Sequence, residues 1–187
     1  MSENAVAMGN TRRLRDFAGT GYDKGRPVVV QAAWFVTQNL AFRKWWFPAR
    51  WRPAMLRLFG GQVGSGVRIR PGVRVHWPWK LVVGDDVWIG EDAWILNLEP
   101  VTIGNDVCVS QGAFLCTGSH QRRSPSFEFD NAPIKLADGS WIAAKAIVLR
   151  GVTVHPGAVV GAGAVVATDL RSGAAVVAAK AVLPGSA

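Results

Sequence analysis

From Val63 to Ala178 an aliphatic residue returns every six positions, interrupted only by a few insertions. Fourteen clear hexads begin with Val, Ile or Leu, and the fifth residue is Val, Ala or Leu in eleven of them. This period fits neither an α-helix nor the two-residue alternation of a long strand. It fits short strands joined by tight corners, in which three hexads make a coil of about eighteen residues and coils stack about 4.8 Å apart. The repeat therefore predicts an all-β solenoid of about five hexapeptide coils.

The insertions into this repeat all follow the third side of a coil. The coils are expected to begin at five inward aliphatic residues: Val63, Val83, Ile103, Ile142 and Val160. Their spacings are 20, 20, 39 and 18 residues, so three of the four exceed an eighteen-residue coil. The extra chain then leaves the prism at one corner each time. We expect the functional site at this corner, because core packing requires no insertion there.

Length, charge and cysteine content set broad limits. The 187 residues are expected to form a polar N-terminal tail (1–26), a helical cap (27–61) and a solenoid domain (62–187) with an inserted loop (121–140). The net charge is +8, but no nucleic-acid-binding motif accompanies the basic clusters, so we expect no nucleic-acid partner. Cys108 and Cys116 show neither metal-ligand spacing nor a disulfide framework, and the polar first 26 residues carry no secretory signal. These features predict a cytoplasmic protein.

An apolar segment precedes the repeat and has two compatible interpretations. Residues 28–40 are apolar but too short to cross a bilayer. Trp45, Trp46 and Trp51 follow, interspersed with Arg and Lys, and two prolines break the segment into two predicted short helices. The helices cap the open end of the first coil in one interpretation. In the other they make a peripheral contact with the inner face of the membrane.

Several stretches resemble the hexapeptide-repeat acyltransferases. They are LCTGSH (115–120), API (132–134), DGSWIAAKAIVLRGVTV (138–154) and VVGAGAVVATDL (159–170). The likeness covers roughly residues 28–177 and is greatest to the branch that O-acetylates sugars during exopolysaccharide assembly, the colanic-acid acetyltransferase type. It implies a left-handed parallel β-helix, a homotrimer, acetyl-CoA as co-substrate and a sugar or glycan acceptor. Attachment of that acceptor to a lipid is a further hypothesis.

His120 is the candidate catalytic residue. The resemblance implies that the histidine of the TGSH element is the catalytic base, and an imidazole is suited to take a proton from a sugar hydroxyl near neutral pH. His120 ends its hexad at the corner where the long insertion leaves, whereas His76 and His155 occupy second positions of ordinary hexads and are expected to lie away from that corner. The alternative for His120 is an ordinary surface-loop histidine. The three histidines do not share one coil offset and so do not converge, and we expect no zinc or other metal site.

Two polar residues on the coil below are candidates for acceptor binding. Coil offsets place Asn97 beneath Thr117 and Glu99 beneath Ser119, where either could bind sugar hydroxyls or orient the imidazole. The resemblance implies an acceptor-binding asparagine on this coil and therefore favours Asn97. The alternative for both is that they satisfy the polar groups of the corner. Cys116 is expected to be a packed thiol, because direct transfer requires no acyl-enzyme.

The resemblance also implies a donor site. It places Trp141 beside donor and acceptor, and it assigns small and polar residues to the coenzyme: Ala143, Ala144, Gly161, Ala162, Ala167, Thr168 and Lys180. At the C-terminus Ala178–Val182 departs from the usual Gly-x-Pro-Ala-basic element, and Gln121 follows His120 in place of the usual acidic residue. The function expected is O-acetylation of a sugar hydroxyl from acetyl-CoA by direct transfer. A non-catalytic scaffold or binding solenoid is the alternative.

Overall fold

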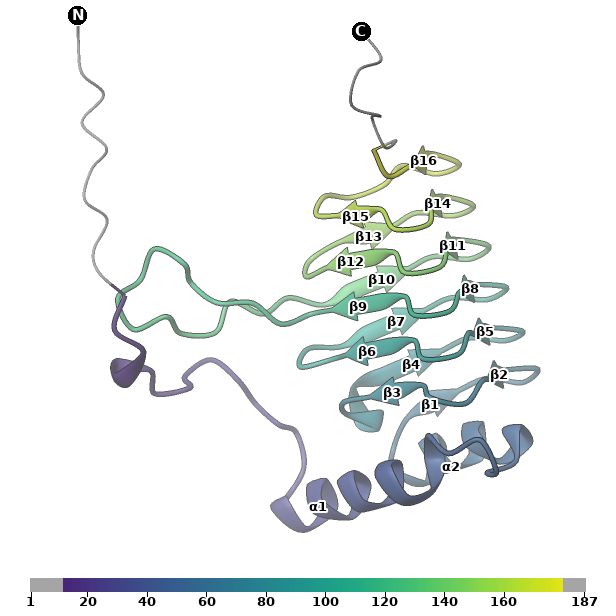
Figure 1. The fold of residues 1–187 in the computed structure, drawn as a ribbon, viewed down its shortest axis with the longest axis horizontal. Helices are drawn as coiled ribbons and strands as arrows, with labels where there is room; N and C mark the ends of the chain where they lie inside the picture. The colour runs from purple at the N-terminus through teal and green to yellow at the C-terminus, as the bar shows by residue number, and fades with distance from the viewer. Residues whose placement is uncertain (1–11, 180–187) are drawn as a thin grey trace, which may run out of the picture.

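The computed structural model describes residues 12–179 and contains a three-sided parallel β-solenoid with helices at one end (Figure 1). The first sheet consists of β1 (Gln62–Val63), β4 (Leu81–Val83), β7 (Val101–Ile103), β10 (Ile134–Leu136) and β13 (Thr153–Val154). The second consists of β2 (Arg68–Ile69), β5 (Trp88–Ile89), β8 (Cys108–Val109), β11 (Trp141–Ile142), β14 (Val159–Val160) and β16 (Ala175–Val176). The third consists of β3 (Arg74–Val75), β6 (Trp94–Leu96), β9 (Phe114–Cys116), β12 (Ile147–Leu149) and β15 (Val165–Val166). Five complete coils and the start of a sixth confirm the predicted solenoid, whose architecture is that of a left-handed β-helix.

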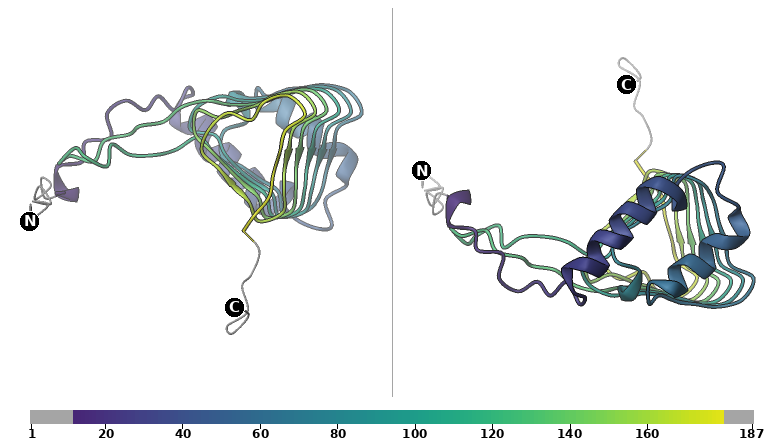
Figure 2. Two further views of the ribbon diagram at one scale, coloured as in Figure 1. Left: turned by 90° about the horizontal axis from the view of Figure 1, so that it is seen from above. Right: turned by 90° about the horizontal axis from the view of Figure 1, so that it is seen from below.

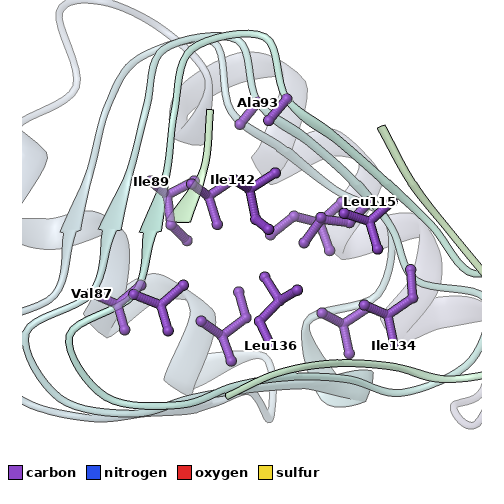
Figure 3. Packing of buried hydrophobic residues seen from close by; sticks show 14 of the residues in the cluster. Val87, Ile89, Ala93, Leu115, Ile134, Leu136 and Ile142 are labelled. Atoms are coloured by element: carbon purple, nitrogen blue, oxygen red, sulfur yellow. The ribbon is translucent and has the colours of Figure 1, made fainter. Parts of the chain in front are cut away.

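The aliphatic residues of the hexads fill the interior of the prism. Figure 3 shows Ile89 and Ile142 pointing inward from the second sheet, Leu115 from the third and Leu136 from the first. Each of these side chains is at most 2% exposed. Burying one such side chain stabilises the fold by about 1.5–3 kcal/mol. The six-residue period therefore reflects one inward aliphatic per side of the prism, stacked from coil to coil.

The fourth coil begins one side earlier than the sequence predicts. Leu136 pairs with Ile103 in the first sheet, whereas Ile142 pairs with Val109 in the second. The prediction that Ile142 begins the fourth coil is therefore wrong, and the expected loop 121–140 extends too far because 134–136 already form β10. The hexad beginning at Leu136 was missed because its fifth residue is Ser140, which is buried although polar.

All insertions do leave from one corner, as predicted. This corner joins the third sheet to the first, and we name it the insertion corner. It contains η4 (Pro78–Lys80), a turn at 97–100, and the excursion at 118–133 that we name the corner loop. Figure 1 shows the corner loop extending far from the prism. The strands above and below stay in register, so the insertions do not disturb the core.

The helical segment closes the lower end of the solenoid. Its elements are α1 (Val28–Thr37), the π-helical turn η2 (Gln38–Phe42), η3 (Ala49–Trp51) and α2 (Arg52–Leu58). Seen from below, α1 and α2 cross the open end of the prism (Figure 2). Trp34, Phe42 and Leu56 are buried in the core, and Trp34 Nε1 donates a hydrogen bond to the carbonyl of Val75 at 2.9 Å. Within residues 12–179 no helix combines the length and apolar character that crossing a membrane requires.

Residues 12–26 form what we name the N-terminal strap, which includes η1 (Leu14–Asp16). Its composition predicts a weakly ordered tail, but the structure packs it against the corner loop and the insertion corner. The Glu128 carboxylate accepts hydrogen bonds from the backbone N–H groups of Ala18 and Thr20, both at 2.8 Å. Trp79 Nε1 donates to the carbonyl of Lys24 at 2.7 Å. The Glu128 contacts join residues 110 and 108 positions apart, which no local pattern in the sequence reveals.

Candidate active site

The corner loop is a hairpin that holds His120 at its base. His120 and Phe129 form an antiparallel bridge, and the backbone N–H of Gln121 donates to the carbonyl of Glu128 at 2.8 Å. Asn131 Oδ1 accepts from the backbone N–H of Ser119 at 3.0 Å. These bonds fix the backbone on both sides of His120, so its ring position is set by the hairpin.

The His120 ring is oriented by its own loop. Its Nδ1 lies 2.8 Å from the carbonyl oxygen of Phe127, and because a carbonyl can only accept, Nδ1 must carry the proton. Nε2 of the neutral ring is then the atom with a free lone pair. The ring stacks on Phe127, with centroids 4.3 Å apart and an interplanar angle of 6°. The ring of Phe17 in the strap is arranged edge to face with the imidazole, with centroids 5.7 Å apart. The half-buried imidazole is therefore held in the tautomer that a general base requires.

Phe127 has an unusual backbone conformation. Its φ is +54°, in the left-handed region that an aromatic residue seldom adopts. Such a conformation costs about 1–2 kcal/mol relative to an ordinary one. Phe127 contributes both the stacking ring and the carbonyl that holds His120. The strain is thus located at the residue that orients the imidazole.

Two hollows lie beside His120. The first has a volume of about 410 Å³ and is lined by Arg12, Ser119, His120, Arg122, Phe127, Asp130 and Arg150. The second, of about 490 Å³, is lined by Gly118, Ser119, Arg122, Leu149, Arg150 and Ala167. Arg150 forms an ion pair with Asp130. Three guanidinium groups and one carboxylate line the first hollow, which gives it a net positive charge suited to an oxygen-rich or anionic ligand.

Asn97 lies beneath Thr117 as predicted, but its side chain is fully buried. Its Oδ1 accepts from the backbone N–H of Trp77 at 2.9 Å, and its Nδ2 donates to the carbonyl of the same residue at 2.6 Å. The amide is therefore used to join two coils, which is the alternative role of satisfying corner groups. Glu99 is half-buried; its charge adds to the dominant effect of burial in raising the pKa of Tyr22.

The residues predicted to bind the donor divide between two corners of the single chain. Ala167 and Thr168 follow β15 at the insertion corner, and Ala167 lines the second hollow beside His120. Trp141 lies on the second sheet, where its Nε1 donates to Ser110 Oγ at 2.9 Å. The remaining candidates follow β11 and β14, at the corner between the second and third sheets: Ala143, Ala144, Gly161 and Ala162. One chain does not bring this second group to His120. Lys180 lies outside the described residues.

The other histidines occupy separate places. His76 follows β3 at the insertion corner, in line with Cys116 two coils above, so its predicted position away from that corner is wrong. Burial lowers the pKa of His76 to about 4, with smaller contributions from the charges of Lys80 and Lys24. His155 is exposed and follows β13 at the corner between the first and second sheets. Within residues 12–179 no cluster of three His, Cys, Asp or Glu side chains is arranged to hold a metal.

Cys116 is half-buried, and burial raises the pKa of its thiol. Its Sγ donates to the carbonyl of Gly118 at 3.3 Å. A thiol in this environment is a poor nucleophile. The geometry agrees with the expectation of a packed thiol.

Comparison with known proteins identifies the family. No protein-family model matches the chain. The chain is 39% identical over 156 residues to the protein of Escherichia coli K12 named as the colanic acid biosynthesis acetyltransferase WcaF, which covers 80% of this chain and 84% of that protein. The chain belongs to the hexapeptide-repeat acetyltransferases. Nodulation protein L of Rhizobium leguminosarum is 30% identical over 155 residues, covering 78% of this chain and 80% of that protein.

Solved structures of this acetyltransferase family share the fold. A hexapeptide-repeat acetyltransferase of Vibrio cholerae in complex with acetyl coenzyme A has a TM-score of 0.75 at 22% identity, covering 88% of this chain and 91% of that chain. A galactoside acetyltransferase in complex with coenzyme A has a TM-score of 0.72 at 19% identity, covering 80% and 76%. The fold of this acetyltransferase therefore has structural counterparts over most of the chain.

Sequence reasoning missed several residues around the acetyltransferase's histidine. Arg12 lies 4.2 Å from the centroid of the Phe127 ring and comes from a segment expected to be a loose tail. Arg150 lies in the hexad VLRGVT, whose pattern predicts only core packing. The alternation of Phe127 and Phe129 in the corner loop was the one available signal, since it is typical of an extended strand with one apolar face.

Proposed function

We propose that this protein transfers the acetyl group of acetyl-CoA to a sugar hydroxyl, with His120 as the general base. The observation that carries the proposal is the hydrogen bond between His120 Nδ1 and the Phe127 carbonyl, which leaves Nε2 free to accept a proton. The relatives support the same reaction class, because the Escherichia coli protein is named as an acetyltransferase of colanic acid biosynthesis. A role in exopolysaccharide biosynthesis follows for this chain as part of the proposal.

The proposed reaction is a direct transfer. His120 Nε2 takes the proton of the acceptor hydroxyl as its oxygen attacks the thioester carbonyl carbon. The tetrahedral intermediate then collapses, the bond between carbon and sulfur breaks, and the imidazolium gives its proton to the departing CoA thiolate. No acyl-enzyme forms, which agrees with the packed position of Cys116. The positively charged hollow beside His120 is the proposed place for the oxygen-rich acceptor.

We propose further that the working enzyme is a homotrimer. The donor-binding candidates around Ala143 and Gly161 lie at a different corner from His120 in one chain. A second copy packed side by side with the first would supply its corner between the second and third sheets to the His120 of its neighbour. The proposed compartment is the cytoplasm, where acetyl-CoA is available.

The test measures release of CoA thiol from acetyl-CoA in the presence of glycan acceptors. His120→Gln removes the base while retaining a polar side chain, and we expect kcat to fall about 10²- to 10⁴-fold with little change in the KM for acetyl-CoA. His155→Gln, at the exposed corner, is the matched control and should retain activity. Turnover by the His120 variant equal to that of the unaltered enzyme would refute the assignment.

A non-catalytic binding solenoid is the alternative function. The departure from the family's coenzyme-binding element at Ala178–Val182 favours it. Calorimetry with CoA distinguishes the two functions. Absence of CoA binding, together with no thiol release for any glycan offered, would support the scaffold.

A further inference from the structure

The outer surface of the helical cap is unusually apolar. Nine large apolar side chains between residues 28 and 58 are more than half exposed: Val28, Val29, Phe35, Val36, Leu40, Trp45, Trp46, Trp51 and Leu58. We name these nine residues, with the exposed basic residues between them, the cap face. Trp45 is 83% exposed and Leu58 is 82% exposed. Monomeric soluble proteins rarely leave so many large apolar side chains together in water, so this surface is expected to have a partner.

The helix α1 shows that the exposure is not a by-product of core packing. Its buried side is formed around Trp34, which reaches the core. At 100° per residue, the opposite arc contains Val28, Val29, Phe35 and Val36, together with two alanines. No charged residue occurs from Pro27 to Phe42. A surface helix normally presents charged residues on its outer side, and α1 presents aliphatic ones instead.

The charged residues of the cap and the first coil are all of one sign. From Lys24 to Gly84 the chain has eleven Lys and Arg residues and no Asp or Glu. Arg26 and Arg57 line one hollow together with Val29 and Leu58. Lys44 and Arg50 are exposed and adjoin Trp45 and Trp51 in the sequence. All 13 acidic residues of the protein lie elsewhere in the sequence. The partner of this surface must therefore tolerate or attract a concentrated positive charge.

An anionic lipid bilayer fits these observations better than a second copy of the chain. A symmetric contact between two cap faces would oppose like charges across an apolar interface. Tryptophan with Lys and Arg is the combination that suits the headgroup layer, with apolar side chains inserted beneath it and basic groups at the anionic surface. In Figure 1 the helices lie at one end of the solenoid, so one flat surface can contact α1 and α2 together.

We propose that the cap face docks on an anionic membrane surface, so that the solenoid extends away from the lipid. His120 belongs to the third coil, two coils above the cap. With coils about 4.8 Å apart and a helix about 10 Å thick, the imidazole then stands about 20 Å above the lipid. This orientation holds whether or not the protein acetylates a sugar. If the proposed function is also correct, it favours an acceptor whose sugar is tethered to lipid.

The test is flotation of the full-length protein with vesicles of phosphatidylcholine alone and of phosphatidylcholine with a quarter phosphatidylglycerol. We expect binding to the anionic vesicles at least ten-fold stronger than to the neutral ones, and most of it should be lost at high salt. The apolar variant is Trp45→Ser with Trp46→Ser, and the charge variant is Lys44→Glu with Arg50→Glu. Each should reduce binding at least ten-fold while the thermal unfolding temperature stays unchanged, because all these side chains are exposed.

Matched controls carry the same chemical changes on the solenoid. Val177→Ser replaces an exposed apolar residue, and Lys135→Glu replaces an exposed basic one. Both should bind vesicles like the unaltered protein. Absence of binding to anionic vesicles would overturn the proposal. Binding by both double variants as strong as that of the unaltered protein would also overturn it. Sedimentation that shows a smaller assembly for the Trp45 and Trp46 variant would assign the cap face to contacts between copies instead.

Discussion

Arg52 joins the cap to the first coil, and replacing it should weaken the protein strongly. Its side chain is 1% exposed although it carries a charge. The guanidinium donates to three backbone carbonyls, those of Phe42 at 2.9 Å, Lys44 at 2.8 Å and Ile69 at 3.3 Å. Burial, followed by repulsion from Arg70, lowers the pKa of Arg52, because both disfavour the charged form of the guanidinium.

The magnitude for Arg52→Met follows from these contacts. Methionine keeps the aliphatic stem but leaves the buried carbonyls of Phe42 and Ile69 without a donor, at about 1–2 kcal/mol each, whereas the Lys44 carbonyl still accepts from the N–H of Phe47. Removing a poorly solvated charge recovers part of that loss. We therefore expect the free energy of unfolding to fall by about 2 kcal/mol.

Urea unfolding followed by tryptophan fluorescence measures this loss, since Trp34 lies in the cap. Arg50→Met removes an exposed arginine two positions away and should change the free energy of unfolding by less than about 0.5 kcal/mol. Because coils of a solenoid can unfold separately, amide exchange in the cap should rise before exchange in the last coils. An Arg52→Met variant within about 1 kcal/mol of the unaltered protein would refute the assigned role.

Three further changes test the core and the corners. Since the pKa of His76 is about 4 in the fold against 6.5 for an ordinary histidine, the unfolded chain takes up the proton first; the protein should lose stability as the pH falls from about 6.5 to about 4. The free energy of unfolding should fall by about 1–2 kcal/mol over this range, after allowance for the partial exposure of the ring. Urea midpoints at both pH values should show this loss in His155→Gln but not in His76→Gln. Gly90→Ala would place a Cβ 2.6 Å from a backbone nitrogen of the next coil and should lower the thermal unfolding midpoint strongly. Gly157→Ala should lower it far less, because its Cβ would meet open space and only the φ of +66° opposes the change. Asn97→Leu leaves the backbone N–H of Trp77 without a partner, whereas the Trp77 carbonyl still accepts from the N–H of Lys80 at 3.1 Å, so the free energy of unfolding in urea should fall by about 1–3 kcal/mol. No loss would show that water replaces the amide.

The fold was predictable because the hexad repeat states which residues face inward. Each side of the prism needs one aliphatic residue at a fixed interval, and that requirement is local in the sequence. The register failed once, where the side at Leu136 has the polar Ser140 at its fifth position and follows the long excursion. The error moved the start of the fourth coil by one side. It therefore also misplaced the corner to which Ala143 and Ala144 belong.

The position of His120 was predictable, whereas its surroundings were not. The insertion after TGSH marks the corner, because extra chain can leave the prism only where the core does not need it. The orientation of the ring depends on the Phe127 carbonyl and on Phe17, which comes from more than 100 positions away. For Asn97 the sequence left both ligand binding and satisfaction of the corner groups open, and only the structure shows that its amide is hydrogen-bonded to the backbone of Trp77.

Restriction of added chain to one corner has a consequence for how such proteins diversify. Lengthening a loop there leaves every ladder of strands intact, and each doubling of loop length costs only about 0.6 kcal/mol of closure entropy. Under the proposed function, exchanging residues 118–133 would change the acceptor preference without changing the coils. Grafting the equivalent loop of a relative onto these coils is accordingly a practical way to alter the chemistry at this corner.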